Sequence, residues 1–538
     1  MNRNGLQWLL LLNLVVSAAC LNQTDAPEPP ETTESNYRAA RDTLLRARQH
    51  FGVPGEGLPS LVLEGSGRLN LSAQFQGQTP GGDTWVEYRE SSAYNDDNRW
   101  LGYSQHYERP DGSRESLRFV YLPPDEMRLV HLVDRFAIHV SSPEFAQTRG
   151  RLARMMPPLL LEEALARPSG LRYLGQRSGE GGPLDAVIMP LDGQSLTLLF
   201  DRQAGHLRGL EYLADVPLLG DTVVAWEFFE PLSGQGLPYP SGYRIQFGGR
   251  TLQEVHYDKV TTSEVDRADV FQIPDEIPTP QPPPPRTAGP PPSPRRPVAR
   301  EVDAGVYIVP ELRGGFHVMF VDLGEDVAAF EAPTGWLELH QVPASDFVPG
   351  ASSGSVSRLY IDLIRETLGD KPIRYLALSH HHGDHAGGLR EFLAEGSTIV
   401  TAAQMTSLVE RAVERPHTLD PDSRAGQSTP ARIEVFSGAR TLGEGPNRIE
   451  LIEYEENDHA QGLTIMYLPE RSILYVADLV YAWPEGRRPH ASHLPSTRRF
   501  AQWLRARDLR PERIYTSHGT ASPLSWERLQ QVLEADGD

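Results

Sequence analysis

A proline-rich run near the middle of the chain limits the fold more than any other feature of the sequence. Twelve of the 24 residues from Pro274 to Pro297 are proline. Proline has no backbone N–H and a fixed φ angle, so such a run favours an extended polyproline II spacer over a helix or a sheet. A chain of 538 residues is also longer than one hydrophobic core usually serves. We therefore expect two folded domains, at 36–273 and 301–538, joined by a linker at 274–300.

The first twenty residues, MNRNGLQWLLLLNLVVSAAC, have the pattern of an export signal. One arginine precedes an apolar stretch from Leu6 to Val16, and small residues then lead to Cys20. The apolar stretch is shorter than the roughly 20 residues that span a bilayer, and small residues are what signal peptidases accept. We predict that residues 1–20 direct export to the cell envelope. The polar, acidic and proline-rich residues 21–35 are predicted to form a disordered tether.

The segment that ends at Cys20 resembles the signal of bacterial lipoproteins. In those proteins the cysteine after the small residues carries acyl chains, so the resemblance implies membrane attachment through a lipidated Cys20. Leu21 rather than Asp follows it, which by the same resemblance favours the outer membrane, facing the periplasm. Ser17 departs from the leucine usual at that place. Ordinary cleavage after Ala19, which would give a secreted or periplasmic soluble protein, therefore stays open.

Charge and composition limit the class of partner. The formal net charge is −21, with 72 acidic against 51 basic side chains. A chain of this charge repels a phosphate backbone. The fractions of apolar residues, 39%, and of charged residues, 23%, are those of a soluble globular protein. We therefore expect a small-molecule substrate and no nucleic acid.

The residues before the proline-rich run alternate between apolar and polar positions. Segments such as SLTLLFDRQAGHLRGLEYL and YRIQFGGRTLQEVHYDKV repeat with a period of two and contain glycine turns, which indicates antiparallel hairpins. Helices are predicted at 37–50 and 151–167. We expect a mainly antiparallel β domain with a few helices, built on a single curved sheet. This strand rhythm resembles the open half-barrels of envelope lipoprotein carriers.

After the proline-rich run, strand patterns and helix patterns follow one another. VYIVP and FHVMFVDL have the pattern of strands, and SVSRLYIDLIRETLG has helical periodicity. RYLALSHHHGDHAGGLREFLAEG indicates a strand, a loop and a helix. Mixed order of this kind predicts an α/β domain whose sheets are covered by helices.

The segment SHHHGDHAGG, residues 379–388, contains four candidate metal ligands within a stretch of six positions. They follow the apolar strand RYLAL in a turn, where the backbone allows them to point at two neighbouring centres. Zinc binds imidazole and carboxylate ligands. A lone histidine is usually solvated or caps a helix, but a cluster favours metal binding. The four residues are His380, His382, Asp384 and His385.

The HxHxDH pattern, between a strand and a helix opened by two glycines, resembles the signature of the metallo-β-lactamase superfamily. That family has further ligands downstream, and residues of the right type follow in order. His459 precedes a strand, Asp478 ends SILYVAD, and His518 follows the last predicted strand. Taken alone, each has an ordinary structural interpretation as a turn cap or a surface residue. The resemblance covers 301–538 and implies a four-layer αββα sandwich for this domain.

The resemblance also implies a site for two zinc ions, with iron or manganese as alternatives. Each ion would have three ligands of its own, and one aspartate would bridge them. The implied ligands are His380, His382 and His459 for the first ion, Asp384, His385 and His518 for the second, and Asp478 as the bridge. Glu331 stands where many relatives have an aspartate, and we expect it to support the site without binding metal.

Such a site implies a hydrolase. Two zinc ions about 3.5–4 Å apart lower the pKa of a bridging water to near 7, so hydroxide is available as the nucleophile. Asp384 would orient the nucleophile and handle its proton. A bridging Asp478 resembles the glyoxalase II and lactonase branches, which favours an ester, thioester or lactone over a β-lactam. Tyr481 has the spacing of a tyrosine in acyl-homoserine lactonases, so we predict that it donates to the oxyanion; a packed core tyrosine is the alternative.

The loop at 483–496 is long and polar and begins with a tryptophan. Arg487 and Arg488 in it could meet an acidic substrate group, and His490 and His493 could approach the site. A solvated loop is the preferred interpretation.

Two other functions stay open at this point. Persulfide dioxygenases of this fold bind one iron through the same residue types, so an iron-dependent oxidoreductase is one alternative. The other is an envelope carrier of apolar ligands, in which the N-terminal sheet does the work and the metal domain is accessory.

Overall fold

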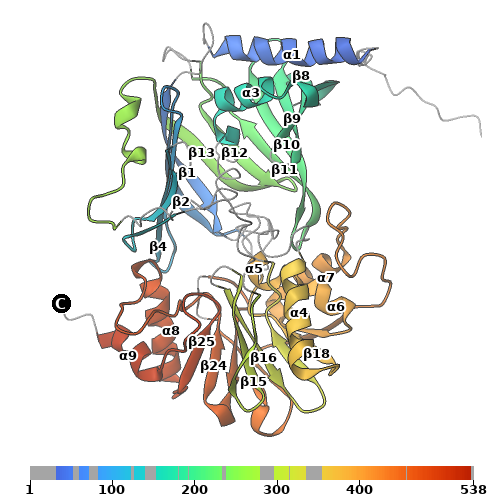
Figure 1. Cartoon of the computed structure of the whole chain (residues 1–538), viewed down its shortest axis with the longest axis vertical. Helices are drawn as coiled ribbons and strands as arrows, with labels where there is room; N and C mark the ends of the chain where they lie inside the picture. The colour runs from blue at the N-terminus through green and yellow to red at the C-terminus, as the bar shows by residue number, and fades with distance from the viewer. Residues whose placement is uncertain are drawn as a thin grey trace, which may run out of the picture.

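The computed structural model describes the chain in two parts, with the N-terminal part above the C-terminal part in Figure 1. The predicted signal with Cys20, most of the predicted tether and residues 279–295 of the predicted linker lie outside the described residues. The described residues are 32–51, 60–71, 83–122, 126–139, 153–179, 181–191, 193–232, 238–278, 296–313, 316–334, 354–455, 457 and 459–534.

Within these residues, thirteen antiparallel strands form one sheet in the first part, called here the N-terminal sheet. Its order is β6-β5-β4-β3-β2-β1-β13-β12-β11-β10-β9-β8-β7, so the first and last strands pair at its middle. Burial alternates along strands such as β11, as expected for a sheet with one face on a core. The prediction of a mainly antiparallel domain is confirmed. The strands are β1 (Leu61–Asn70), β2 (Trp85–Asn95), β3 (Trp100–Glu108), β4 (Arg114–Leu122), β5 (Glu126–His131), β6 (Phe136–His139), β7 (Arg172–Gly179), β8 (Gly182–Leu191), β9 (Gln194–Asp201), β10 (Leu207–Val216), β11 (Gly220–Phe228), β12 (Gly242–Phe247) and β13 (Arg250–Thr261).

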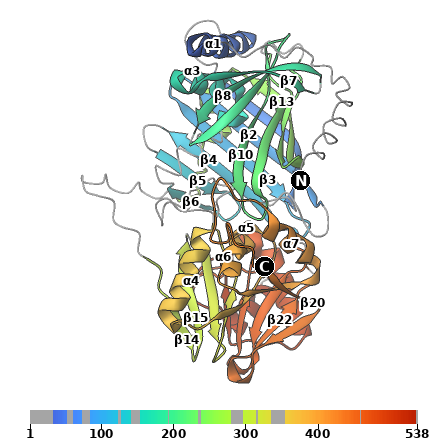
Figure 2. The same ribbon diagram turned by 90° about the vertical axis from the view of Figure 1, so that its right-hand side faces the viewer.

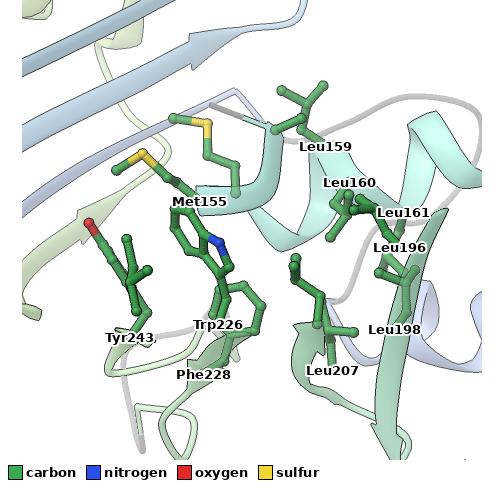
Figure 3. Close-up of a cluster of buried hydrophobic side chains, with 14 of the residues drawn as sticks. Met155, Leu159, Leu160, Leu161, Leu196, Leu198, Leu207, Trp226, Phe228 and Tyr243 are labelled. Atoms are coloured by element: carbon green, nitrogen blue, oxygen red, sulfur yellow. The ribbon is translucent and has the colours of Figure 1, made fainter. Parts of the chain in front are cut away.

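Two helices, α1 (Thr33–His50) and α3 (Pro157–Leu165), pack on the N-terminal sheet. Figure 3 shows side chains of α3 and of the residue Met155 before it facing apolar side chains of the strands. Leu160, Trp226 and Phe228 belong to this buried cluster. Burial of this apolar surface is the main force that holds the helices on the sheet.

Helix α1 begins earlier than predicted and includes the last residues of the predicted 21–35 tether. The side chain of Thr32 accepts the N–H of Ser35 (3.1 Å), and the Ser35 hydroxyl in turn accepts the N–H of Thr32 (3.1 Å). This reciprocal capping satisfies N–H groups that the first turn leaves free, which stabilises the early start. The described residues of this part also include the short 3₁₀ helices η2 (Pro168–Gly170), η3 (Val265–Arg267) and η4 (Asp269–Phe271).

The second part contains two sheets within the described residues, called here the large sheet and the small sheet. The large sheet has the order β14-β15-β16-β17-β18-β19-β20 and is parallel from β17 onward. The small sheet has the order β21-β22-β23-β24-β25, with only its last pair parallel. The strands are β14 (Arg300–Asp303), β15 (Val306–Arg313), β16 (Phe316–Asp322), β17 (Val327–Phe330), β18 (Ile373–Ala377), β19 (Thr398–Ala402), β20 (Arg432–Phe436), β21 (Ala439–Leu442), β22 (Ile449–Glu453), β23 (Thr464–Leu468), β24 (Ile473–Val476) and β25 (Arg513–Thr516).

Buried apolar clusters join these sheets to each other and to helices. One cluster contains side chains of both sheets, such as Phe330 and Tyr475. A second joins the large sheet to α4, α6 and α7, and a third joins the small sheet to α8 and α9. The two sets of helices lie on opposite sides of this part in Figure 1. The helices are α4 (Ser355–Leu368), α5 (Gly383–Ala386), α6 (Leu389–Ala394), α7 (Thr406–Glu414), α8 (Leu494–Ala506) and α9 (Trp526–Glu534), with 3₁₀ turns η6 (Ala403–Met405), η7 (Gly445–Asn447), η8 (Pro469–Arg471) and η9 (Ala491–His493).

The N-terminal sheet contacts the second part through its strand ends, and both views place α5 at this boundary (Figures 1 and 2). The turn between β10 and β11 is one contact. Leu218 in this turn belongs to the apolar cluster of the large sheet, and the N–H of Asp221 donates to the carbonyl of Pro416 (2.8 Å). The two parts are therefore packed together next to the helix that follows the predicted metal motif.

Among the helices of the described residues, none is both long enough and apolar enough to cross a bilayer.

Candidate metal centre

The HxHxDH turn lies at the end of β18 and leads into α5. The backbone of His382 is extended, and its carbonyl accepts the N–H of His385 (3.0 Å), which begins the helix. His380 and His382 therefore lie in the loop after β18, and Asp384 and His385 lie on the first turn of α5. All four are almost completely buried.

The two glycines after this turn are required by close packing. A Cβ atom on Gly387 would lie 2.7 Å from Cβ of Pro217 in the turn between β10 and β11. A Cβ atom on Gly388 would collide with the hydroxyl of Ser357 in α4. Both glycines have negative φ angles. Glycine is therefore required at these two positions because a side chain would not fit, and not because the backbone adopts a conformation that only glycine favours.

Two groups of side chains converge at this turn, and Asp478 belongs to both. In each group the ligand atoms lie within 4.8 Å of one another. Asp478 comes from the residues after β24, and His518 from those after β25. The first group is His380, His382, His459 and Asp478, and the second group is Asp384, His385, His518 and Asp478. The structure thus brings together all seven residues that the sequence suggested.

The two carboxylate oxygens of Asp478 face different groups. Oδ2 lies 3.1 Å from Nε2 of His459 and 3.6 Å from Nε2 of His380 in the first group. Oδ1 lies 3.0 Å from Nε2 of His385 and 3.2 Å from Nε2 of His518 in the second group. This is the arrangement expected of a carboxylate that bridges two cations.

The residues of both groups fit divalent cations. Asp384 is buried, yet neither of its carboxylate oxygens has a hydrogen-bond donor among the described residues. In the first group, Nε2 of His380 lies 2.9 Å from Nδ1 of His382 and 3.2 Å from Nε2 of His459. Buried carboxylates and crowded imidazole nitrogens need a positive partner, and a divalent cation with nitrogen and oxygen ligands provides it.

The histidines of the two groups differ in the direction in which their pKa values shift. Burial lowers the pKa of His380, and burial followed by the charge of His380 lowers that of His382 to about 3. Both rings are therefore neutral, the form that binds metal. Burial alone would lower the pKa of His385, but Asp478, Asp384 and Glu331 outweigh it and raise that pKa.

Glu331 supports the second group from behind, as the sequence suggested. Its Oε1 lies 3.2 Å from Nδ1 of His385, and its Oε2 accepts the hydroxyl of Ser379 (3.0 Å). A proton on Nδ1 of His385 leaves Nε2 directed at the cluster. Glu331 has a φ angle of +70°, which is uncommon for a residue other than glycine. The surrounding packing holds it there, since it is fully buried.

Tyr481 lies beside the cluster, as part of a stack of three rings. Its ring is parallel to that of His518 at 5.0 Å between centroids, and parallel to that of His493 at 3.9 Å. Burial, followed by the charge of Asp478, raises the pKa of Tyr481, so its hydroxyl is protonated. It therefore has a proton to donate at the edge of the metal centre.

The preferred interpretation of 483–496 as a solvated loop is wrong for its second half. Arg487 and Arg488 are exposed, as expected. In contrast, His493 stacks on Tyr481, and His490 packs edge-on against Phe136 of β6, 6.0 Å between centroids. This half of the loop packs against residues of the N-terminal sheet. Such a contact cannot be predicted from the sequence of the loop alone.

Three supporting residues were not anticipated. The ring of Phe316 contacts the rings of both His385 and His518, at 5.0 and 5.1 Å between centroids. His317 is fully buried, and its Nε2 lies 3.1 Å from the carbonyl of Gly519, so it holds the loop after β25. The hydroxyl of Ser379 contacts Nδ1 of His380 (2.9 Å). Phe316 and His317 act across the fold, so no short motif could have indicated them, whereas Ser379 is the first residue of the SHHHGDHAGG segment and directly precedes His380.

Residues 350–518 match the family model of the Metallo-beta-lactamase superfamily. The C-terminal part of the chain therefore contains a metallo-β-lactamase superfamily domain, and all seven clustered residues lie inside the match. Members of this superfamily are mostly hydrolases. The clustered histidines and aspartates of this domain are suited to divalent metal ions.

Several solved structures are similar to less than half of the chain, at low identity. A metallo-beta-lactamase from Pontibacter korlensis is 18% identical, covering 44% of this chain and 97% of its own, with a TM-score of 0.30. The mono-zinc form of the metallo-beta-lactamase FIM-1 from Pseudomonas aeruginosa is 15% identical, covering 45% and 96%, with a TM-score of 0.30. The flavodiiron core of Flv1 from Synechocystis is 14% identical, covering 44% and 61%, with a TM-score of 0.32. No curated protein matches the chain significantly.

Proposed function

We propose that this protein is a metal-dependent hydrolase that acts on an ester, thioester or lactone carbonyl and holds two zinc ions. The observation that carries the proposal is the geometry of Asp478. Its two oxygens face two separate histidine groups at 3.0–3.2 Å. The succession of apolar clusters from helices through two sheets to helices supports the four-layer αββα arrangement expected for such an enzyme.

Two zinc ions bound there would supply a water of lowered pKa and would polarise the carbonyl oxygen. The first ion would be held by His380, His382 and His459, the second by Asp384, His385 and His518, and both by Asp478. We leave Glu331 outside the ligand set, because its carboxylate is already engaged by His385 and Ser379.

The protein's own side chains account for proton handling and charge stabilisation. Oδ2 of Asp384 lies 3.4 Å from Nε2 of His385 and 3.5 Å from Nε2 of His518, and these rings outweigh burial and lower the pKa of Asp384. Asp384 is therefore ionised, and we assign to it the orientation of the attacking water and the handling of its proton. Tyr481, protonated and stacked on His518, can donate to the oxyanion that develops on the carbonyl. These roles belong to different residues and can be tested separately.

The substrate class follows from the bridging residue. A carboxylate at this place resembles the glyoxalase II and lactonase branches of the superfamily, whereas true β-lactamases of the fold generally have cysteine or serine there. We therefore propose that esters, thioesters and lactones are better substrates of this enzyme than β-lactams.

The test combines metal analysis with a substrate screen. Purified protein should contain two zinc ions per chain. In a screen of lactones, thioesters, β-lactams and phosphodiesters it should hydrolyse at least one lactone or thioester in a chelator-sensitive way. Asp478→Asn should lose metal and lower turnover by roughly a hundredfold or more. Asp508→Asn, a change of an exposed aspartate, is the matched control and should alter neither. One iron and no zinc per chain, or turnover that survives the chelator, would refute the proposal.

We further propose that the enzyme is attached to the outer membrane through Cys20. Only the signal-like sequence at 1–20 supports this. Labelled fatty acid should be incorporated into the intact protein in a bacterial host and not into Cys20→Ser. Incorporation into neither would favour a soluble envelope protein.

A further inference from the structure

The hairpin between β3 and β4 extends from the N-terminal sheet to the metal domain. The N–H of Arg109 donates to the carbonyl of Ser113 (2.8 Å) and closes the turn. A Cβ atom on Gly112 would lie 3.9 Å from Cγ of Pro495, in the first turn of α8. Asp111 lies 3.4 Å from the guanidinium of Arg499 in the same helix. The turn that carries Arg109 is therefore docked on the metal domain.

The next hairpin along the sheet docks beside it. Asp134, between β5 and β6, accepts the N–H of Ser492 (3.0 Å) and its hydroxyl (2.7 Å). Nδ1 of His490 lies 3.5 Å from the same carboxylate. Two hairpins of the N-terminal sheet thus hold the loop whose His493 stacks on Tyr481 next to the second metal group.

The side chain of Arg109 is held in place by residues of its own hairpin. Its Nη2 donates to the hydroxyl of Tyr107 (3.3 Å) and lies 3.6 Å from Oε2 of Glu115. Tyr107 donates to Glu115 (2.8 Å), and Gln105 donates to the other oxygen of Glu115 (3.3 Å). The side chain of Arg109 is only 14% exposed. Strand residues on a rigid sheet therefore fix its position, which is what a binding residue needs.

The hairpin that carries Arg109 lies against the residues that border the metal centre. Its turn contacts Pro495, two positions after His493, and the ring of His493 stacks on Tyr481, which in turn stacks on the ligand His518. Burial, followed by the positive charge of Arg109, lowers the pKa of His493 to about 3, in agreement with this placement. The N-terminal sheet thus holds a fixed positive charge on a hairpin that packs next to the metal centre.

A guanidinium has five N–H donors in a planar fork. Within the described residues, the side-chain hydrogen bond of Arg109 uses one nitrogen, Nη2. The two carboxylates of the metal groups carry two negative charges, against four positive charges on two divalent cations. With cations bound, Asp384 and Asp478 would be more than neutralised, so Arg109 would add to a positive region.

We propose that Arg109 is a substrate-binding residue that recognises a carboxylate on the substrate, so that the N-terminal domain determines the specificity of the metal site. This inference rests on the proposed function and narrows its substrates to carbonyl esters that carry an acidic group. It also assigns a role to the N-terminal sheet, one hairpin of which forms a wall of the active site.

A pair of esters that differ by one carboxylate tests the inference. The metal-loaded full chain is assayed with 4-nitrophenyl acetate and with the mono-4-nitrophenyl ester of succinic acid. Arg109→Ala should lower the ratio of kcat/KM for the acidic over the neutral ester by about 10- to 100-fold, the range for a hydrogen bond to a charged group. Arg109→Lys should recover part of the ratio, because lysine keeps the charge but not the fork. Arg114→Ala changes an exposed arginine of the same hairpin and should leave both esters unaffected.

Binding of succinate, followed by calorimetry on the same metal-loaded proteins, gives a readout that does not need turnover. Affinity should fall in Arg109→Ala by a factor similar to that in the ester ratio, and not in Arg114→Ala. Metal content and thermal melting establish that the variants are folded and loaded. An unchanged ester ratio and unchanged succinate affinity in Arg109→Ala would overturn the inference. If the wild-type protein cleaves neither ester, the ester proposal fails for this class, and the succinate titration alone decides the role of Arg109.

Discussion

Glu331→Gln tests whether a residue that binds no metal controls the metal centre. The carboxylate of Glu331 lies 3.2 Å from Nδ1 of His385 and accepts the hydroxyl of Ser379. Both Glu331 and His385 are fully buried, so water cannot replace the lost contact. The amide that replaces the carboxylate has the same shape but no charge. It can also present its NH₂ group to Nδ1, which would move the ring proton to Nε2, the nitrogen that faces Asp478.

The expected magnitude follows from this geometry. Loss of a carboxylate that orients a ligating histidine typically weakens metal binding by about 10- to 100-fold, or about 1.4 to 2.8 kcal/mol. Glu331 contacts His385 of the second group directly but reaches His380 of the first group only through Ser379. We therefore expect the affinity of the second zinc ion to fall more than that of the first. Competition with a chromogenic zinc chelator measures the two affinities separately. Glu325→Gln, at an exposed position in the turn between β16 and β17, is the control. Equal affinities of both ions in Glu331→Gln and wild type would show that Glu331 does not support the centre.

Three further changes test separate parts of the structure. Gly388→Ala introduces a Cβ that collides with Ser357, so the free energy of unfolding should fall by about 1–3 kcal/mol in denaturant titration; an unchanged midpoint would contradict the packing argument. Tyr481→Phe should lower kcat by roughly a hundredfold if the hydroxyl donates to the oxyanion, and unchanged turnover on every accepted ester would exclude that role. Asp134 has a lowered pKa, because Ser492 and His490 outweigh burial, so its contribution to stability is present above its unfolded pKa of about 3.9 and is lost as the pH falls below it. Melting temperatures from pH 7 to pH 3 should therefore fall less steeply in Asp134→Asn than in wild type, whereas Asn at the exposed Asp97 should keep the wild-type slope.

The metal ligands were the most predictable part of the molecule. Four of them lie in one turn, where chain connectivity alone keeps them close. The other three follow strand ends of one small sheet or precede its strands, and strand ends at the same edge of a sheet meet in space. The order of residue types along the chain was therefore enough to bring His459 and His518 into the predicted set.

The N-terminal sheet was predictable in class and not in its role. The period of two and the glycine turns specify antiparallel hairpins locally. They do not specify that β1 pairs with β13, or which hairpins reach the metal domain, since those contacts join residues hundreds of positions apart. The solvated-loop interpretation of 483–496 failed for this reason.

The sequence by itself determined that antiparallel hairpins precede the proline-rich run and that the residues after it carry a cluster of histidines and aspartates suited to cations, because short motifs and local periodicity encode both. Only the tertiary structure decided that Asp478 turns one oxygen to each group, that Glu331 contacts His385, and that the hairpin of Arg109 docks on the first turns of α8. These positions depend on how separate elements pack, and packing between distant segments leaves no pattern in the residues on either side.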